Sequence, residues 1–236
     1  MKLEFERGMS EAKRWFRHSG LCIRNLNGTI VASAKPVSAD RKSEEQMAFR
    51  HAVKEAGKAW KVMAAEDREA WNAYARRFGS QISDQRYKDL SGWEVFLPAF
   101  LSRTLLGEAP VARPAGMAPP KPVTGIEEVP STNPDTFSFR VSHRMAPKGH
   151  ALVVRITPAT RSRARRPYAR TARLIRGHGP DSVVALPPSG GVVTFEGARF
   201  SIAPGQRYGV AMRIVRLSDG VGSREFFADL NRAEPP

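Results

Sequence analysis

The clearest candidates for chemistry in this sequence are the arginines between residues 161 and 176. Arg161, Arg163 and Arg165 alternate with other residues, so an extended backbone would direct their side chains to one side. Planar guanidinium groups donate paired hydrogen bonds to phosphate and carboxylate groups. We therefore predict an anion-binding or partner-binding site formed by Arg161, Arg163, Arg165, Arg166, Arg170 and Arg173. The alternative, a solvated loop between two strands, stays open, because only some surface loops carry function.

No other set of residues has the spacing of a catalytic or metal site. The five histidines show no HExxH pattern, and the single cysteine, Cys22, has no apparent histidine partner. The nucleophile pattern GxSxG and the phosphate-loop pattern GxxxxGK are absent. The Ser189-Gly190-Gly191 run precedes a predicted strand rather than a helix, so we expect a turn there. These observations predict a protein that is not an enzyme and has no cofactor and no metal.

The chain is basic over its whole length. Its 236 residues include 38 Lys and Arg against 23 Asp and Glu, which gives a formal net charge of +15. Residues 1–107 hold 19 basic and 13 acidic side chains, and the rest of the chain holds 19 and 10. Such an excess favours polyanionic partners, with double-stranded DNA or an acidic protein surface as candidates. No run of about 18 apolar residues occurs, so we expect no membrane partner.

A proline-rich segment divides the sequence into two parts of different character. Residues 108–123 contain five prolines and show no apolar period. The preceding residues are typical of helices, and the following ones are typical of short strands. We predict an α+β multi-domain protein, with a mainly helical module and a β-hairpin at residues 1–107 and a linker at 108–122. Residues 123–236 are expected to form an antiparallel β-sandwich of the immunoglobulin or fibronectin III type.

Apolar residues at steps of three and four predict the helices of the first part. We expect a short helix at 9–18, a hairpin at 21–33, and then helices from about residue 43, at 66–78 and at 92–106. Gly79 is expected to end the second of these long helices. Ser91 and Glu94 have the spacing of a capping box, and Pro98 predicts a kink or a late start in the last helix.

Three of the four tryptophans lie on these apolar stripes. Trp60, Trp71 and Trp93 recur at helical spacing with other apolar residues. Because such a stripe usually faces the core, we expect buried tryptophans rather than a stacking surface for bases.

Alternating apolar and polar residues predict short strands in the second part. The expected strands are 126–129, 136–142, 150–157, 170–176, 182–186, 192–202, 208–217 and 223–230. Glycine-containing turns separate several of them, as is typical of a sandwich.

This order of features resembles a loosely defined family of proteins from tailed phages, prophages and some environmental bacteria. The resemblance covers about residues 20–110 and includes the segments GLCIRNLNGTIVASAKPV, AGKAWKVMAAEDREAWNAYA and LSGWEVFLPAFLSRTLLG. The matching residues are Gln46, Arg50, Trp60, Arg68, Ala70, Trp71, Gly92, Trp93, Phe96 and Gly107. The glycine-rich opening expected of the family is replaced here by SEAKRWFRH, so the resemblance assigns no role to residues 1–18.

The resemblance implies a particle component rather than an enzyme. We therefore expect a structural or assembly protein of a phage-like particle, associated with the capsid, neck or tail. Its partners would be other virion or assembly subunits, in multiple copies of a ring or shell, with double-stranded DNA as a further candidate. It would be found in the virion, or in the host cytoplasm during assembly. The alternative, a free cytoplasmic DNA-binding or nucleoid-type protein, stays open and would show strongly salt-dependent DNA binding.

Overall fold

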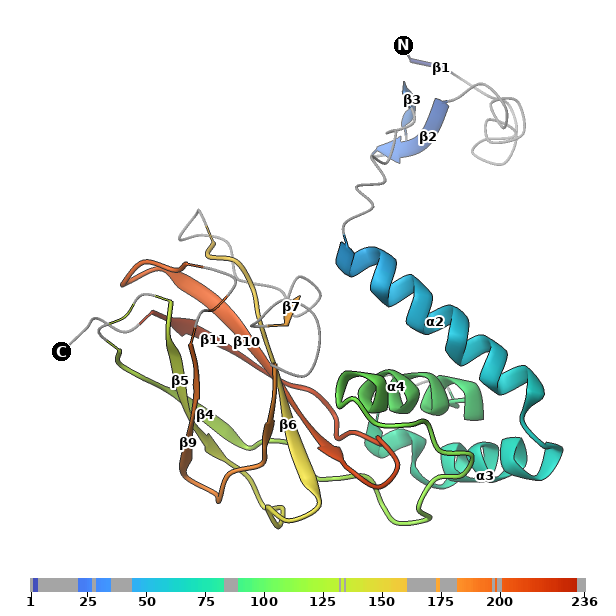
Figure 1. Cartoon of the computed structure of the whole chain (residues 1–236). Coiled ribbons are helices and arrows are strands. Elements are labelled where there is room, and N and C mark those ends of the chain that lie inside the picture. Colours follow the sequence, from blue (N-terminus) through green and yellow to red (C-terminus); the bar gives the residue numbers. More distant parts are fainter. Residues whose placement is uncertain are drawn as a thin grey trace. The chain divides into compact units, whose positions relative to one another are not determined.

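The computed structural model places most of the chain from residue 44 onward and short stretches before it (Figure 1). It describes residues 2–3, 21–26, 29–34, 44–82, 89–131, 133, 135–160, 173–174, 182–196, 198 and 201–232. The chain forms two compact units, Met1–Ser43 and Glu44–Pro236. The predicted boundaries at residues 107 and 123 both fall inside the second unit.

The first unit contains a three-stranded antiparallel sheet in the order β1-β3-β2. Strands β2 (Leu21–Leu26) and β3 (Thr29–Ala34) pair along their whole length, which confirms the predicted hairpin strands. Strand β1 (Lys2–Leu3) adds to the other edge of β3 and was not predicted, because two residues carry no periodicity. The Asn27-Gly28 turn and the helix expected at 9–18 lie outside the described residues.

The second unit begins with three helices, α2 (Glu44–Val62), α3 (Ala65–Ile82) and α4 (Gly92–Leu105). Helix α4 packs against both of the others. The ring of Phe96 lies at the centre of their contact, with its centroid 5.2 Å from that of Trp60 and 5.4 Å from that of Trp71. Trp71 is buried, and Trp60 and Trp93 pack against the same apolar cluster, so the prediction of core tryptophans is confirmed for these three.

Local sequence signals set the start of α4 but not the end of α3. The Ser91 hydroxyl accepts a hydrogen bond from the Glu94 N–H, and the Glu94 carboxylate accepts one from the Ser91 N–H, which completes the predicted capping box. Helix α4 begins at Gly92 and contains Pro98, so a late start is wrong. The predicted stop at Gly79 is also wrong. Gly79 is buried inside α3 against Leu90, where tertiary packing outweighs its weak helix propensity.

Two sandwich-like antiparallel sheets follow the helices. Strands β4 (Gly125–Val129), β5 (Phe137–Ser142) and β9 (Gly191–Phe195) form one sheet in the order β4-β5-β9. The other has the order β11-β10-β6-β7, with β8 also paired to β6. Its strands are β6 (His150–Ile156), β7 (Arg173–Leu174), β8 (Val183–Ala185), β10 (Arg207–Arg216) and β11 (Phe226–Asn231). The α+β class is therefore confirmed.

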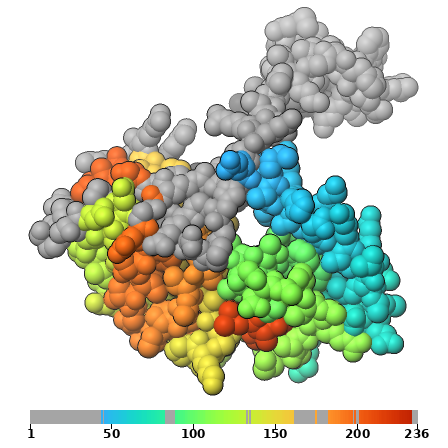
Figure 2. All heavy atoms as spheres, in the orientation of Figure 1, coloured from blue at the N-terminus to red at the C-terminus, as the bar shows by residue number. Residues whose placement is uncertain are grey.

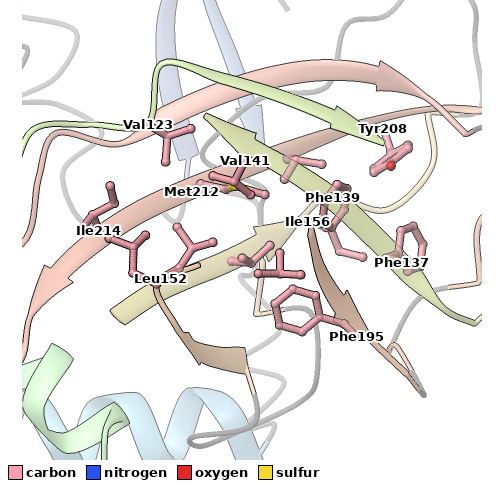
Figure 3. Packing of buried hydrophobic residues seen from close by; sticks show 14 of the residues in the cluster. Val123, Phe137, Phe139, Val141, Leu152, Ile156, Phe195, Tyr208, Met212 and Ile214 are labelled. Atoms are coloured by element: carbon pink, nitrogen blue, oxygen red, sulfur yellow. The ribbon is translucent and has the colours of Figure 1, made fainter. Parts of the chain in front are cut away.

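The two sheets bury a continuous apolar cluster between them (Figure 3). Phe137 and Phe139 on β5 stack with their ring centroids 6.3 Å apart, and Leu152 and Met212 approach from β6 and β10. Alternation along the strands directs these side chains to one face of each sheet. The period-2 pattern predicted the strands that carry this core, while β10 is buried along most of its length.

Two strand boundaries differ from the prediction by three or more residues. Strand β9 ends at Phe195 although strand was expected to residue 202, and β11 begins at Phe226 rather than at 223. Residues 217–225 instead form the turn between β10 and β11, and Val221 in this turn belongs to the helical cluster. Of the strand expected at 170–176, the structure describes only Arg173 and Leu174 in β7. Figure 2 shows the turn between β10 and β11, in red, against the green surface of the preceding segments.

Gly220 is required at this turn for two reasons, and its replacement tests both. Its φ is +76°, and an added Cβ would lie 2.6 Å from Cγ of Arg103 and clash with the carbonyl oxygen of Ala99. We expect Gly220→Ala to lower the free energy of unfolding by about 2–5 kcal/mol, from left-handed backbone strain plus overpacking. The measurement is urea denaturation followed by circular dichroism.

Gly205 is the matched control, because its φ is +74° but no atom lies within 4 Å of its added Cβ. Gly205→Ala should therefore lower the free energy of unfolding only through left-handed backbone strain, by about 1–2 kcal/mol. Equal losses in the two variants would show that the turn does not press against α4.

Candidate anion-binding surfaces and the buried ionic network

The predicted arginine site falls almost wholly outside the described residues. Arg161, Arg163, Arg165, Arg166 and Arg170 are among the residues that the structure does not describe. The backbone of Arg173 lies in β7, paired with Ile156 of β6, but its side chain is also outside the described set. The anion-binding role of these six residues therefore stays a prediction.

Several arginines of the sandwich that are described have carboxylate partners. Arg155 pairs with Glu225, Arg207 with Asp229, and Arg140 with Glu127. The Arg155–Glu225 pair joins β6 to the residue before β11, the Arg207–Asp229 pair joins the neighbouring strands β10 and β11, and the Arg140–Glu127 pair joins β5 to β4. These three arginines therefore have partners within the sandwich.

Arg216 with Asp219 is one of two deeply buried ion pairs among the described residues. Nη2 of Arg216 lies 2.7 Å from Oδ2 of Asp219, and Nε lies 3.0 Å from Oδ1. The two residues are 5% and 2% exposed. The Asp219 carboxylate also accepts hydrogen bonds from the backbone N–H groups of Val221 and Ala115. Burial acts to lower the pKa of Arg216, but the hydrogen bonds and charge of Asp219 outweigh burial and raise it.

The same network holds the proline-rich segment against the helices. The carbonyl oxygens of Ala112 and Met117 accept hydrogen bonds of 2.8 Å from the Trp71 indole N–H and the Tyr74 hydroxyl. The Arg216 guanidinium donates to the carbonyl oxygens of Met117 and Ala118. Proline cannot donate a backbone hydrogen bond, but the carbonyls of such a segment remain good acceptors. Residues 108–122 were predicted as a linker. They are mostly exposed, but hydrogen bonds from α3 and β10 to their carbonyls hold them as a strap.

A second buried network closes the far end of the sandwich. Arg232 pairs with Glu128, and its guanidinium also donates a 2.7 Å hydrogen bond to the Thr136 carbonyl. The Tyr208 hydroxyl donates to the same Glu128 carboxylate. The Arg232 guanidinium lies 4.1 Å from the centroid of the Phe137 ring. This cluster ties β4, β5, β10 and the end of β11 together, so its charged groups are structural.

Arg213 is the least compensated guanidinium among the described residues of the sandwich. It lies on β10 against Gly222, where any added Cβ would clash with the guanidinium. Its Nε has no hydrogen-bond partner in the structure, and burial lowers its pKa to about 10. The nearest opposite charge, Glu225, is already paired with Arg155.

The described histidines have structural partners. His143 is buried, and its Nδ1 accepts the Met145 N–H, so Nε2 is the atom that donates to the Pro187 carbonyl 2.8 Å away. Nδ1 of His150 contacts the Ala146 carbonyl oxygen. The predicted turn at Ser189 is confirmed, and the Ser189 hydroxyl accepts the His143 N–H. In the part of the chain that the structure places, no three His, Cys, Asp or Glu side chains gather as a metal site would need.

Helix α2 carries the most exposed charges of the helical bundle. Its first two turns are exposed wherever the structure describes their side chains, and only its later turns pack in the bundle. Arg50, Lys54, Lys58 and Lys61 lie at steps of four, four and three along its solvent side. The helix therefore presents a line of cations outside the region where we predicted an anion site.

Sequence reasoning missed the residues that organise the interior. The Asp219-Gly220 sequence indicates a turn, but the sequence did not distinguish Arg216 and Asp219, three residues apart, from other charged residues. Nothing local indicates that Tyr74 and Trp71 donate to carbonyls more than 40 residues away. The line of cations on α2 could have been found from its helical spacing.

Comparisons with known proteins leave the family open. No protein-family model matches the chain, and a search of curated proteins finds no matching sequence. Among the described residues, no helix combines the length and the apolar character that crossing a membrane demands. The resemblance to phage proteins therefore stays a hypothesis.

Removing the carboxylate of Asp219 tests the central ion pair. Asp219→Asn keeps the side-chain shape but leaves the buried Arg216 charge without its partner. We expect a loss of about 3–5 kcal/mol in the free energy of unfolding, as for other buried pairs broken on one side. The exposed Arg140–Glu127 pair is the control, and Glu127→Gln should cost at most about 1 kcal/mol. Similar urea midpoints for the two variants would contradict a structural role for Asp219.

The buried tyrosines predict a loss of stability at alkaline pH. Burial raises the pKa of Tyr74, and burial with the hydrogen bond to Glu128 raises that of Tyr208. The unfolded chain releases these protons near pH 10, and the folded chain releases them only at higher pH. The stability that these raised pKa values contribute is therefore complete below about pH 10 and is lost as the pH rises toward the pKa values of the folded chain. Urea midpoints should fall between about pH 9.5 and 11, and fall less steeply in Tyr208→Phe. The same slope in the variant would count against this assignment.

Proposed function

We propose that this chain is a non-enzymatic assembly protein of a phage-like particle, associated with the capsid, neck or tail. The observation that carries the proposal is the exposed start of helix α2. Phe49 is 60% exposed and Met47 is 49% exposed on a helix whose later turns are packed. Phe49 continues the apolar line of Ala56 and Trp60 beyond the cover that α4 supplies. Exposed apolar side chains at such a position favour a protein partner.

A neighbouring subunit of the particle is the partner that this helix fits. Isolated helical turns are marginal in water, so an overhanging helix end gains most from a docking surface. Repeated docking of one chain on its neighbours generates rings and shells. The protein would then act in the virion, or in the host cytoplasm while the particle assembles.

The sandwich would present further contacts on a rigid frame. We propose that it is fibronectin III-like, and its strand order supports this assignment. Strands β4, β5 and β9 form one sheet in the order β4-β5-β9, and the other sheet has the order β11-β10-β6-β7 with β8 also paired to β6. Tyr208 occupies the second position of β10, the strand where immunoglobulin-like folds carry a buried corner tyrosine. Its hydroxyl donates to the Glu128 side chain instead of the usual backbone carbonyl.

The alternative is a free DNA-binding or nucleoid-type protein. The net charge of +15 and the line of cations on α2 favour it. Fractionation separates the two candidates, because a particle component sediments with particles even after nuclease treatment.

The test is incorporation into particles made by the source organism. Particles banded on a density gradient after nuclease treatment should contain the chain, detected with an antibody. Phe49→Asp should reduce incorporation at least about tenfold while thermal unfolding of the free chain changes little, because the residue is exposed. Val192, 46% exposed on β9, is the control, and Val192→Asp should leave incorporation unchanged. A chain that stays at the top of the gradient would contradict the particle role.

A further inference from the structure

Four basic side chains form a line along one side of helix α2. Arg50, Lys54, Lys58 and Lys61 recur at steps of four, four and three, and residues at these steps share a face. All four are exposed. The line runs for about 16 Å at the helical rise of 1.5 Å per residue. The buried Ala56 marks the opposite side of the helix, so the bundle leaves the cations to solvent.

The charges of this line are only partly compensated. Lys58 lies 2.8 Å from the Glu55 carboxylate, which it shares with His51. Within the described part of the chain, Lys54 and Lys61 have no carboxylate at ion-pair distance. Arg76 and Arg140, by contrast, pair with Glu69 and Glu127.

Gly57 lies inside this line, and neither its backbone conformation nor the packing around it requires glycine. It is three residues after Lys54 and four before Lys61, so both lysines flank it on the helix surface. No atom lies within 4 Å of an added Cβ, and its backbone φ is not positive. Glycine is among the weakest helix formers, and alanine at this position would fit and favour the helix. A bare backbone between two cations suits the close approach of an external group.

We propose that this face of α2, residues 50–61, binds the phosphate backbone of double-stranded DNA. A line of evenly spaced cations fits a linear array of anions better than a compact carboxylate cluster, and duplex DNA carries one charge per about 1.7 Å of its axis. The exposed Glu44 at the start of α2 would be repelled by the phosphates that line a DNA groove, so the helix lies across the backbone rather than inserting its first turn. Contacts to phosphates alone give binding without base preference.

This inference deepens the proposed function by locating a contact for packaged DNA, but the free chain can test it. Binding of the full-length chain to a fluorescein-labelled duplex of about 30 base pairs is followed by anisotropy at several salt concentrations. The double variant Lys54→Gln, Lys61→Gln should lower affinity at least about tenfold near 0.1 M salt. It should also reduce the slope of log K against log salt by about 2, because each phosphate contact contributes about 0.9.

Two further variants separate a specific face from net charge. Arg76→Gln with Arg140→Gln removes the same charge from paired sites and should leave the salt slope unchanged. Gly57→Ala should raise the melting temperature by about 2 °C as a better helix former, yet weaken DNA binding severalfold. The proposal is overturned by any of three results. The two double variants could lose DNA affinity equally, Gly57→Ala could leave the affinity unchanged, or the chain could bind polyglutamate but not DNA. Failure here would leave the particle test with Phe49→Asp unaffected.

Discussion

The second unit depends on one buried ion pair that organises groups from three distant parts of the chain. Arg216 and Asp219 neutralise each other at the β10–β11 turn, and together they bind the strap that follows α4. The strap carbonyls also accept from Trp71 and Tyr74 of α3. Because a buried charge without a partner is strongly unfavourable, the turn, the strap and α3 must assemble together. The proline-rich segment is therefore hydrogen-bonded to both α3 and β10.

This arrangement changes how the basic composition is interpreted. A net charge of +15 suggests a surface covered with free cations, but several described arginines serve the fold. Arg216 and Arg232 are buried with carboxylates, and Arg155 and Arg207 join strands of one sheet. The cations of α2 are more exposed, and lysine rather than arginine predominates there. Lysine keeps its charge hydrated on a flexible stem, whereas arginine forms the fixed, forked hydrogen bonds that a packed interior needs.

The two faces of α2 connect the proposed roles. One face holds the bundle through Ala56 and Trp60 and then extends, uncovered, to Phe49. The other carries the cations around Gly57. A helix of this kind can contact a neighbouring protein on one side and a polyanion on the other. In a particle that encloses DNA, both contacts would be available to the same copy.

The sequence by itself determined the local structure and much of each core. Apolar steps of three and four located α2, α3 and α4, alternation located β4 to β6 and β10, and Ser91 with Glu94 marked a helix start, because these signals act between near neighbours. The tertiary structure alone decided that Gly79 continues a helix, that β11 begins only at Phe226, and that the strap is held by hydrogen bonds to its carbonyls. It also decided which arginines are buried, since the partners of Arg216 and Arg232 include groups about 100 residues away. Such contacts depend on the summed packing of the whole unit, and no short window of sequence contains that information.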